Sequence, residues 1–210
     1  MLRISTMCIL EANPPTGFTL TFSNSIIMIN PSNISIITKK TSETHLPLYI
    51  LVTTPKIIST IAELADEHYV ASPPPKRIEE IPPTVYVYPI EKPIHIPRRI
   101  KAYFLDPPPR ESQDYFILLE TPFAEILIAP RTTNISNPPT LDVILTNERT
   151  IQQAKQQAKN IDELPKYLGA DAQWCIAISK HDATEDQTIY INKKKYIIQR
   201  HLTQINIIET

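Results

Sequence analysis

The chain has 210 residues, of which 42% are hydrophobic, enough to bury the core of one domain. Its 21 basic and 22 acidic residues nearly balance, and the net charge of −1 excludes a global field that would attract nucleic acid or an anionic membrane. The longest apolar stretches, such as residues 49–52, are far shorter than the ~20 residues of a membrane helix, so we expect a cytoplasmic protein with no membrane span.

Residue usage restricts the chemistry of the loops. The chain has two glycines and 21 prolines, whereas an average glycine content of ~7% would give about fifteen. Phosphate-cradling loops and many catalytic turns are disfavoured, because they need backbone conformations that glycine adopts freely. The two cysteines, Cys8 and Cys175, lie far apart among strand-forming residues and predict neither a disulfide framework nor a zinc site. The many isoleucines and prolines are typical of thermophilic proteins.

The first half of the chain predicts short strands and one helix. Strands are expected at residues 2–10, 18–22, 26–29, 34–37 and 48–52, where apolar residues alternate or run continuously. Pro55 then begins a helix that runs to Tyr69, with Thr54 as its N-cap. Prolines between residues 73 and 83 bracket a segment without regular structure, and a strand resumes at 84–88.

The second half predicts more strands, interrupted by helices. Strands are expected at 99–105, 114–120, 123–128, 141–145 and 174–178, and the first two form an antiparallel pair. Asn147 is suited to cap a polar helix over 148–159, and a shorter helix that begins at Ile161 ends at Gly169. A hairpin over 187–199 and a strand near 204–208 follow. Residues 1–210 therefore read as one domain, with residues 181–210 as a C-terminal β extension.

Four landmarks occur in a recognisable order. They are the opening strand, a strand that ends Ile29-Asn30-Pro31, a strand that ends Val52-Thr53-Thr54-Pro55 and leads into a helix, and later sheet segments that end Ile128-Ala-Pro-Arg-Thr132. This order resembles the metallo-β-lactamase superfamily, nearest its lactonase-like branch, over the first six-sevenths of the chain. The resemblance implies an α/β fold of four layers, an αββα sandwich, here with a C-terminal β-hairpin extension.

The metal ligands that the resemblance implies do not occur at the matching positions. In the family, the strand that corresponds to residues 48–52 runs into Thr-His-x-His-x-Asp-His. These residues bind zinc, and the zinc activates a water molecule. Here that place reads Thr53-Thr54-Pro55-Lys56-Ile57-Ile58-Ser59. The bridging Asp of the family's Gly-Asp-Thr falls on Arg131, whose positive charge would repel a metal. The degenerate former metal-site positions are thus Thr54, Lys56, Ile58, Ser59 and Arg131, and we expect no cofactor and no metal.

The isolated reactive residues form no complete catalytic set. None of the five histidines has metal-ligand spacing, and His181, near the place of the family's last ligand, has no companions. Cys175 reads as a small buried residue of a core strand. Ser59 or Ser179, with Lys56 or Lys180, could form a Ser–Lys arrangement, but glycine-rich oxyanion donors are absent. We expect side chains such as Ile57 and Ile58 to fill the place of the metals.

Basic and aromatic residues gather between residues 76 and 101. Six cations oppose three carboxylates there, which gives a net charge of +3. The candidate binding surface consists of Lys76, Arg77, Tyr86, Tyr88, Arg98, Arg99 and Lys101. Such a surface could bind a phosphate backbone and stack bases, although the residues favour an ordinary solvated, proline-rich connection.

These observations favour a catalytically inactive metallo-β-lactamase-like protein, not an enzyme, that acts as a protein-binding or structural subunit in a homo- or hetero-oligomer. Its binding surface is expected in the proline-bracketed segment 71–110 or along the C-terminal hairpin. A nucleic-acid-binding module that uses residues 76–101 is the first alternative. A metal-independent hydrolase with a rebuilt site is the second.

Overall fold

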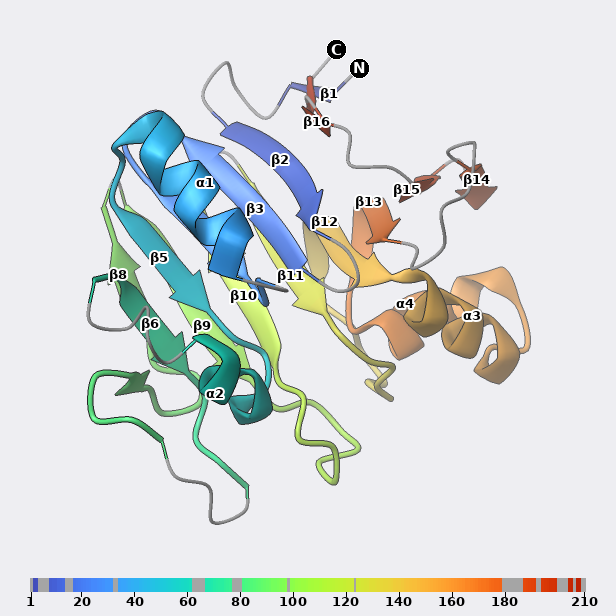
Figure 1. The fold of residues 1–210 in the computed structure, drawn as a ribbon. Helices are drawn as coiled ribbons and strands as arrows, with labels where there is room; N and C mark the ends of the chain where they lie inside the picture. Colours follow the sequence, from blue (N-terminus) through green and yellow to red (C-terminus); the bar gives the residue numbers. More distant parts are fainter. Residues whose placement is uncertain are drawn as a thin grey trace.

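Two mixed β-sheets pack face to face at the centre of the computed structural model, and helices lie on the outside of both (Figure 1). The structure describes residues 2–3, 8–13, 17–31, 34–61, 67–76, 81–97, 99–122, 124–178, 187–191, 194–199, 204–205 and 207–208. This arrangement is the αββα sandwich predicted from the sequence.

The first sheet has the strand order β16-β2-β3-β4-β5-β6-β7. Its strands are β2 (Cys8–Asn13), β3 (Gly17–Phe22), β4 (Ile26–Ile29), β5 (Leu48–Leu51), β6 (Tyr69–Ser72), β7 (Tyr86–Val87) and β16 (Gln204–Ile205). Strands β2 to β4 are antiparallel, whereas β4 to β7 are parallel. Parallel neighbours need a crossover connection. Helix α1 (Ile34–Thr44) connects β4 to β5, and the 3-10 turn η1 (Pro55–Ile57) with α2 (Ile58–Ile61) follows β5.

The second sheet has the strand order β14-β15-β13-β12-β11-β10-β9-β8. Its strands are β8 (Ile94–Ile96), β9 (Ile100–Leu105), β10 (Phe116–Glu120), β11 (Glu125–Ala129), β12 (Thr140–Asn147), β13 (Asp171–Ile178), β14 (Gln187–Ile191) and β15 (Lys194–Gln199). The crossover from β12 to β13 contains α3 (Glu148–Gln157), η3 (Ile161–Glu163) and α4 (Leu164–Leu168). The hairpin β14–β15 extends this sheet beside β13, as predicted. Strands β1 (Leu2–Arg3) and β17 (Ile207–Ile208) form a separate parallel pair.

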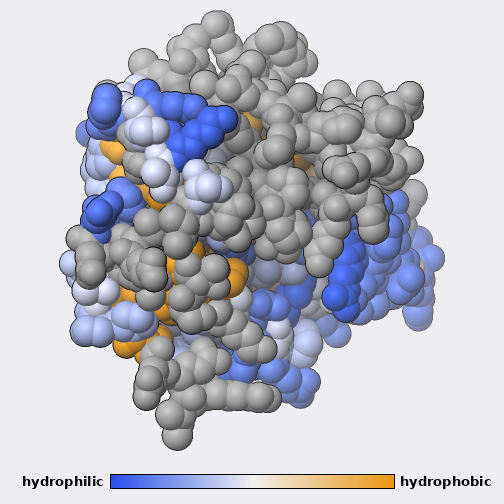
Figure 2. Space-filling view, viewed as in Figure 1, coloured by the Kyte–Doolittle hydropathy of each residue, from blue (hydrophilic) through white to orange (hydrophobic). Residues whose placement is uncertain are grey.

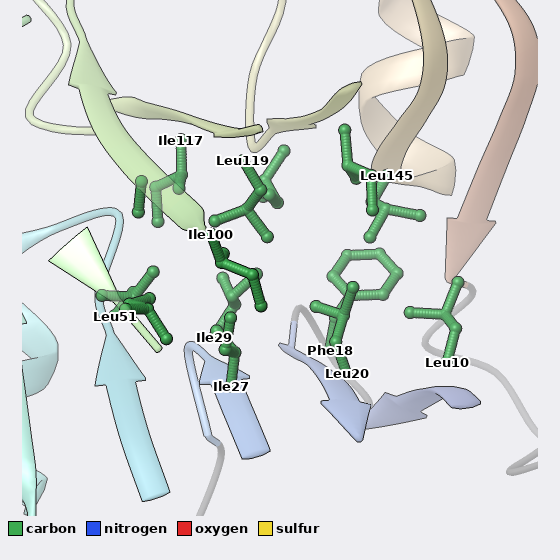
Figure 3. Close-up of a cluster of buried hydrophobic side chains, with 14 of the residues drawn as sticks. Leu10, Phe18, Leu20, Ile27, Ile29, Leu51, Ile100, Ile117, Leu119 and Leu145 are labelled. Atoms are coloured by element: carbon green, nitrogen blue, oxygen red, sulfur yellow. The ribbon is translucent and has the colours of Figure 1, made fainter. Parts of the chain in front are cut away.

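The main hydrophobic core fills the space between the two sheets. In Figure 3, Phe18, Ile29 and Leu51 of the first sheet face Ile117 and Leu145 of the second. Two further clusters lie between a sheet and its helices, one under α3 and α4 and the other beside α1 and α2. The outer surfaces of α1 and of α3 and α4 are hydrophilic in Figure 2, as expected for helices that bury one face only.

One predicted strand is wrong. Residues 34–37 were expected to form a strand because three of the four are isoleucines, but they begin α1. Ile37 is fully buried in the cluster beside α1 and α2. The parallel pairing of β4 with β5 requires a crossover in this interval, and that tertiary demand outweighs the β propensity of isoleucine.

Smaller differences occur around β6 to β8. The helix expected to run from Pro55 to Tyr69 does not reach that residue, because Tyr69 begins β6. Strand β8 was not predicted, and the strand expected at 84–88 is limited to Tyr86–Val87. These are short strands, and pairing with neighbours determines them more than their own pattern does.

Two helix boundaries in the second half are as predicted. Asn147 caps α3, since its side-chain oxygen accepts a hydrogen bond of 2.9 Å from the N–H of Thr150. Gly169 ends α4 in the left-handed region, with a φ of 92°. A Cβ at this position would lie 2.8 Å from Cε2 of Phe116, so both conformation and packing require glycine.

Replacing Asn147 with alanine is expected to lower the free energy of unfolding by about 1 kcal/mol, the usual cost of losing an N-cap. Aspartate at this position should retain part of the stability, because its carboxylate accepts the same bond but cannot donate to the carbonyl of Pro130, as the Asn147 amide does at 3.1 Å. Chemical denaturation of the three proteins measures the difference. Equal stability of the alanine variant and wild type would contradict the prediction.

Candidate functional site

Asn30 and Thr53 join the carboxyl ends of two parallel strands, β4 and β5. Asn30 Nδ2 donates to Thr53 Oγ1 at 2.8 Å, and the N–H of Thr53 donates to Asn30 Oδ1, also at 2.8 Å. Both residues are buried, and Asn30 has a φ of 46°, which asparagine tolerates better than most residues. The asparagine of Ile29-Asn30-Pro31 therefore has a structural role: its two hydrogen bonds to Thr53 join the ends of β4 and β5. We call this pair of residues the Asn30–Thr53 clasp.

Tyr115 connects this edge to the second sheet. Its N–H donates to the carbonyl of Thr53 at 2.7 Å, and its hydroxyl donates to the carbonyl of Pro74 at 2.9 Å. Burial raises the pKa of the Tyr115 phenol, and the nearby Asp106 carboxylate raises it further. The phenol thus remains a neutral donor that ties the two sheets together.

Arg131 is held at the same edge by a set of backbone acceptors. Its Nε donates to the carbonyl of Asp114 at 2.9 Å, Nη1 to Thr132 at 3.1 Å and Nη2 to Pro107 at 2.8 Å. Its guanidinium lies 5.3 Å from the centre of the Phe116 ring. Burial lowers the pKa of Arg131, while Asp106 and Asp114 act to raise it.

Asp106 lies between Arg131 and Lys76. Its Oδ1 accepts a hydrogen bond of 2.7 Å from Lys76 Nζ and lies 3.5 Å from Arg131 Nη2. Lys76 also donates to the carbonyl of Arg110 at 2.7 Å and lies 4.7 Å from the centre of the Tyr115 ring. The three charged side chains are only 10 to 19% exposed. We call Lys76, Asp106 and Arg131 the Asp106 cluster.

The Asp106 cluster does not fit the zinc ions that the fold family implies. The Arg131 guanidinium occupies the position matched to the bridging aspartate and is bonded to three carbonyls. Among the residues that the structure describes, no group of three or more His, Cys, Asp and Glu could hold a metal ion. The buried Thr54 Oγ1 has no described hydrogen-bond partner, but one hydroxyl does not make a metal site.

The structure gives several predicted site residues other roles. Thr54 occupies the N-cap position of η1, but its side chain makes no capping bond. Ile58 belongs to the cluster beside α1 and α2, and Ile57 packs against that cluster. Their apolar side chains thus pack between the helices and the first sheet, and the expectation that they fill the place of the metals stays a prediction. The side chains of Lys56 and Ser59 lie outside what the structure describes, as do residues 179–181.

Some side chains of the predicted basic and aromatic surface are buried in the structure, whereas others are exposed to solvent. Lys76 belongs to the buried Asp106 cluster. Tyr88 is half-buried and hydrogen-bonds to the hydroxyl of Tyr69, whereas Tyr86 is 54% exposed and stacks on the Tyr69 ring at 4.7 Å. Arg99 is exposed, and Lys101 is 3.7 Å from Glu120. Arg77 and Arg98 lie outside the described residues.

Sequence reasoning missed Asp106 and the role of Lys76. Asp106 stands between a strand and three consecutive prolines and was read as a loop residue, whereas Lys76, which directly follows another three prolines, was assigned to the candidate binding surface. A sequence signal that could have identified both residues is a charged side chain directly beside a run of prolines that follows a strand. Their pairing, across 30 positions of the chain, was not visible in any local pattern.

Cys175 is a buried residue of β13, as its sequence context suggests. Burial raises the pKa of its thiol to about 12, so the thiol is protonated at neutral pH. A protonated, enclosed thiol is a poor nucleophile.

The likeness to known proteins concerns the fold. No protein-family model matches the sequence, and no curated protein is significantly similar to it. A mutant of the CmlA β-hydroxylase has a TM-score of 0.51 and 8% identity, over 81% of this chain and 45% of that one. The Bacillus subtilis metallo-β-lactamase fold protein YhfI has a TM-score of 0.49 and 9% identity, over 81% of this chain and 85% of that one.

A metallo-β-lactamase from Staphylococcus aureus subsp. aureus COL has a TM-score of 0.49 and 13% identity, over 77% of this chain and 52% of that one. The chain thus spans about half the length of this neighbour. The two face-to-face mixed sheets with outer helices form the αββα sandwich predicted from the sequence, and it is this fold that the chain shares with the CmlA β-hydroxylase mutant. The fold is one that carries enzymes, a β-hydroxylase among them. No described helix is long and apolar enough to cross a membrane.

Proposed function

We propose that this chain is a catalytically inactive metallo-β-lactamase-like protein that works as a protein-binding or structural subunit. The observation that supports the proposal is the environment of Arg131, whose guanidinium bonds to the carbonyls of Asp114, Thr132 and Pro107 and lies beside Asp106. A cation secured in this way stabilises the loops around it. Arg131 also stands at the position that the resemblance assigns to the family's bridging aspartate.

The alternatives have weaker support. A metal-independent hydrolase needs an activated nucleophile, a base and oxyanion donors. At the described part of the edge, the Thr54 hydroxyl is buried without a described partner that could act as a base. A nucleic-acid module would use cations beside exposed aromatics. Tyr86 offers one such ring, but Lys76 is bonded to Asp106 and Tyr88 to Tyr69.

The first test of the proposal is metal content. Protein produced with zinc, iron and manganese in the medium is expected to contain far less than one ion per chain by plasma mass spectrometry. Addition of a chelator should leave its melting temperature unchanged. Nearly one bound ion per chain, together with stability lost on chelation, would overturn the proposal.

The second test is activity. We expect no turnover of lactone, ester, thioester or phosphodiester substrates above the rate in buffer, with or without added zinc or manganese. Turnover that persists through a final purification step and disappears in a Thr54→Val variant would favour the rebuilt hydrolase instead.

A further inference from the structure

A row of polar side chains crosses the outer face of the second sheet. His95, Lys101, Glu120 and Glu125 are aligned by strand pairing across β8, β9, β10 and β11. Asp142 of β12 continues the row, because its Oδ2 accepts a hydrogen bond of 2.8 Å from the N–H of Glu125. We call these five residues the charged row. Since side chains alternate along a strand, their neighbours in sequence point into the main core.

The charged row lies on the part of the sheet away from the helices. The cluster under α3 and α4 is built mainly from β11, β12, β13 and the helices themselves. His95, Glu125 and Asp142 are exposed, and the side chains of Lys101 and Glu120 are 44% and 37% exposed. The row borders a hollow of about 760 Å³, whose lining also includes Arg99.

The charges along the row are separated by sign. His95, Arg99 and Lys101 form a basic half, whereas Glu120, Glu125 and Asp142 form an acidic half. Glu120 stands directly opposite Glu125 in an antiparallel pair, an arrangement of like charges that destabilises a sheet. Lys101 and Tyr103 contact Glu120, at 3.7 Å and 3.0 Å. Within the described residues, no ion pair joins a cation to Glu125 or Asp142, and only Glu120 of the acidic half contacts a cation, Lys101.

A surface that is basic at one end and acidic at the other is complementary to itself after a two-fold rotation. In such an interface residue i of one copy meets residue j of the other, and j meets i. The next pair along the same face, Tyr103 and Leu118, is half-buried and adds apolar surface beside the charges. Aromatic and apolar residues flanked by charges are the usual composition of a protein interface.

We propose that the charged row is the surface through which two copies of this chain associate about a two-fold axis, with the basic half of each copy against the acidic half of the other. The inference rests on the proposed function, because it names a second copy as the partner of a binding protein. Opposite-charge contacts across the axis place cations of one copy beside the Glu125 and Asp142 carboxylates of the other.

The test uses two single charge reversals in the full chain, Lys101→Glu and Glu125→Lys. Wild type is expected to be a dimer by sedimentation and light scattering, and its dissociation constant should rise with salt. Each reversal places like charges across the axis, and we expect the dissociation constant of each variant to increase by about tenfold or more. Lys39→Glu, at an exposed position of α1, changes the net charge as Lys101→Glu does and should leave the dimer intact.

Mixing the two reversed variants gives the decisive result. In the mixture, the carboxylate introduced at position 101 of one variant lies opposite the ammonium introduced at position 125 of the other, and the native Glu125 of the first lies opposite the native Lys101 of the second. The two variants are therefore expected to form a heterodimer with at least the affinity of the wild-type dimer. Circular dichroism and melting temperature show whether each variant remains folded on its own.

A wild type that is monomeric would overturn the inference, and so would a dimer that both reversals leave unchanged. A mixture that stays monomeric would overturn it as well. These outcomes are distinct from failure of the proposed function, which stoichiometric metal or substrate turnover would show even if the protein is a dimer.

Discussion

Replacing Arg131 with alanine is expected to lower the free energy of unfolding by about 3 kcal/mol, because one partner of a buried ion pair and several hydrogen bonds are lost together. The change leaves the carbonyls of Pro107 and Asp114 without their guanidinium donors. It also leaves Asp106, which is 10% exposed, with Lys76 as its cation. Denaturant unfolding monitored by circular dichroism measures the loss.

Two variants separate the causes of this effect. Arg131→Lys keeps a positive charge near Asp106 but lacks the planar fork, so it should recover only part of the stability. Arg149→Ala removes an exposed arginine from α3 and should change the stability by no more than about 0.5 kcal/mol. If Arg131→Ala unfolds as Arg149→Ala does, the Asp106 cluster does not stabilise the fold and the main support for the proposed function is lost.

Replacing Asn30 with alanine is expected to lower the free energy of unfolding by a similar amount, about 3 kcal/mol. Two buried groups of Thr53, its N–H and its hydroxyl, lose their partners in this variant. In addition, alanine is strained at a φ of 46°, which costs about 1 kcal/mol relative to a residue that adopts the left-handed region. The melting temperature should fall accordingly.

Asn30→Gly distinguishes the two contributions. Glycine relieves the backbone strain but restores neither hydrogen bond, so we expect it to be more stable than the alanine variant and less stable than wild type. Asn134→Ala, at an exposed position, is the matched control and should have little effect. An Asn30→Gly variant as stable as wild type would show that the clasp to Thr53 contributes nothing.

The Arg131 and Asn30 variants also test which contacts stabilise the edge of the sandwich at the carboxyl ends of β4 and β5. In the family that the sequence resembles, the metal ligands follow the ends of the strands. Here the Asn30–Thr53 clasp, the bonds of Tyr115 and the Asp106 cluster connect such strand ends. Loss of stability in both series would show that these hydrogen bonds and ion pairs stabilise this edge of the sandwich.

Much of the fold was contained in local patterns of the sequence. The continuous apolar run of Ile26–Ile29, the cap at Asn147 and the helix end at Gly169 each depend on a few neighbouring residues, and all three are present in the structure. The order of landmarks was sufficient to predict the sandwich. It was also sufficient to show that the family's metal ligands have no counterpart at the matching positions.

Only the tertiary structure decided the features that depend on distant residues. Residues 34–44 form a helix because β4 and β5 are parallel neighbours. Lys76 and Asp106 meet across 30 positions of the chain, and strand register alone aligns His95 with Lys101 and Glu120. Periodicity and capping report on contacts within a few residues, whereas these contacts arise when two sheets close on a shared core. The sequence by itself therefore determined many of the strands, two helix boundaries and the lack of the family's ligands at the matching positions, and the packing of the sheets decided which charges lie together.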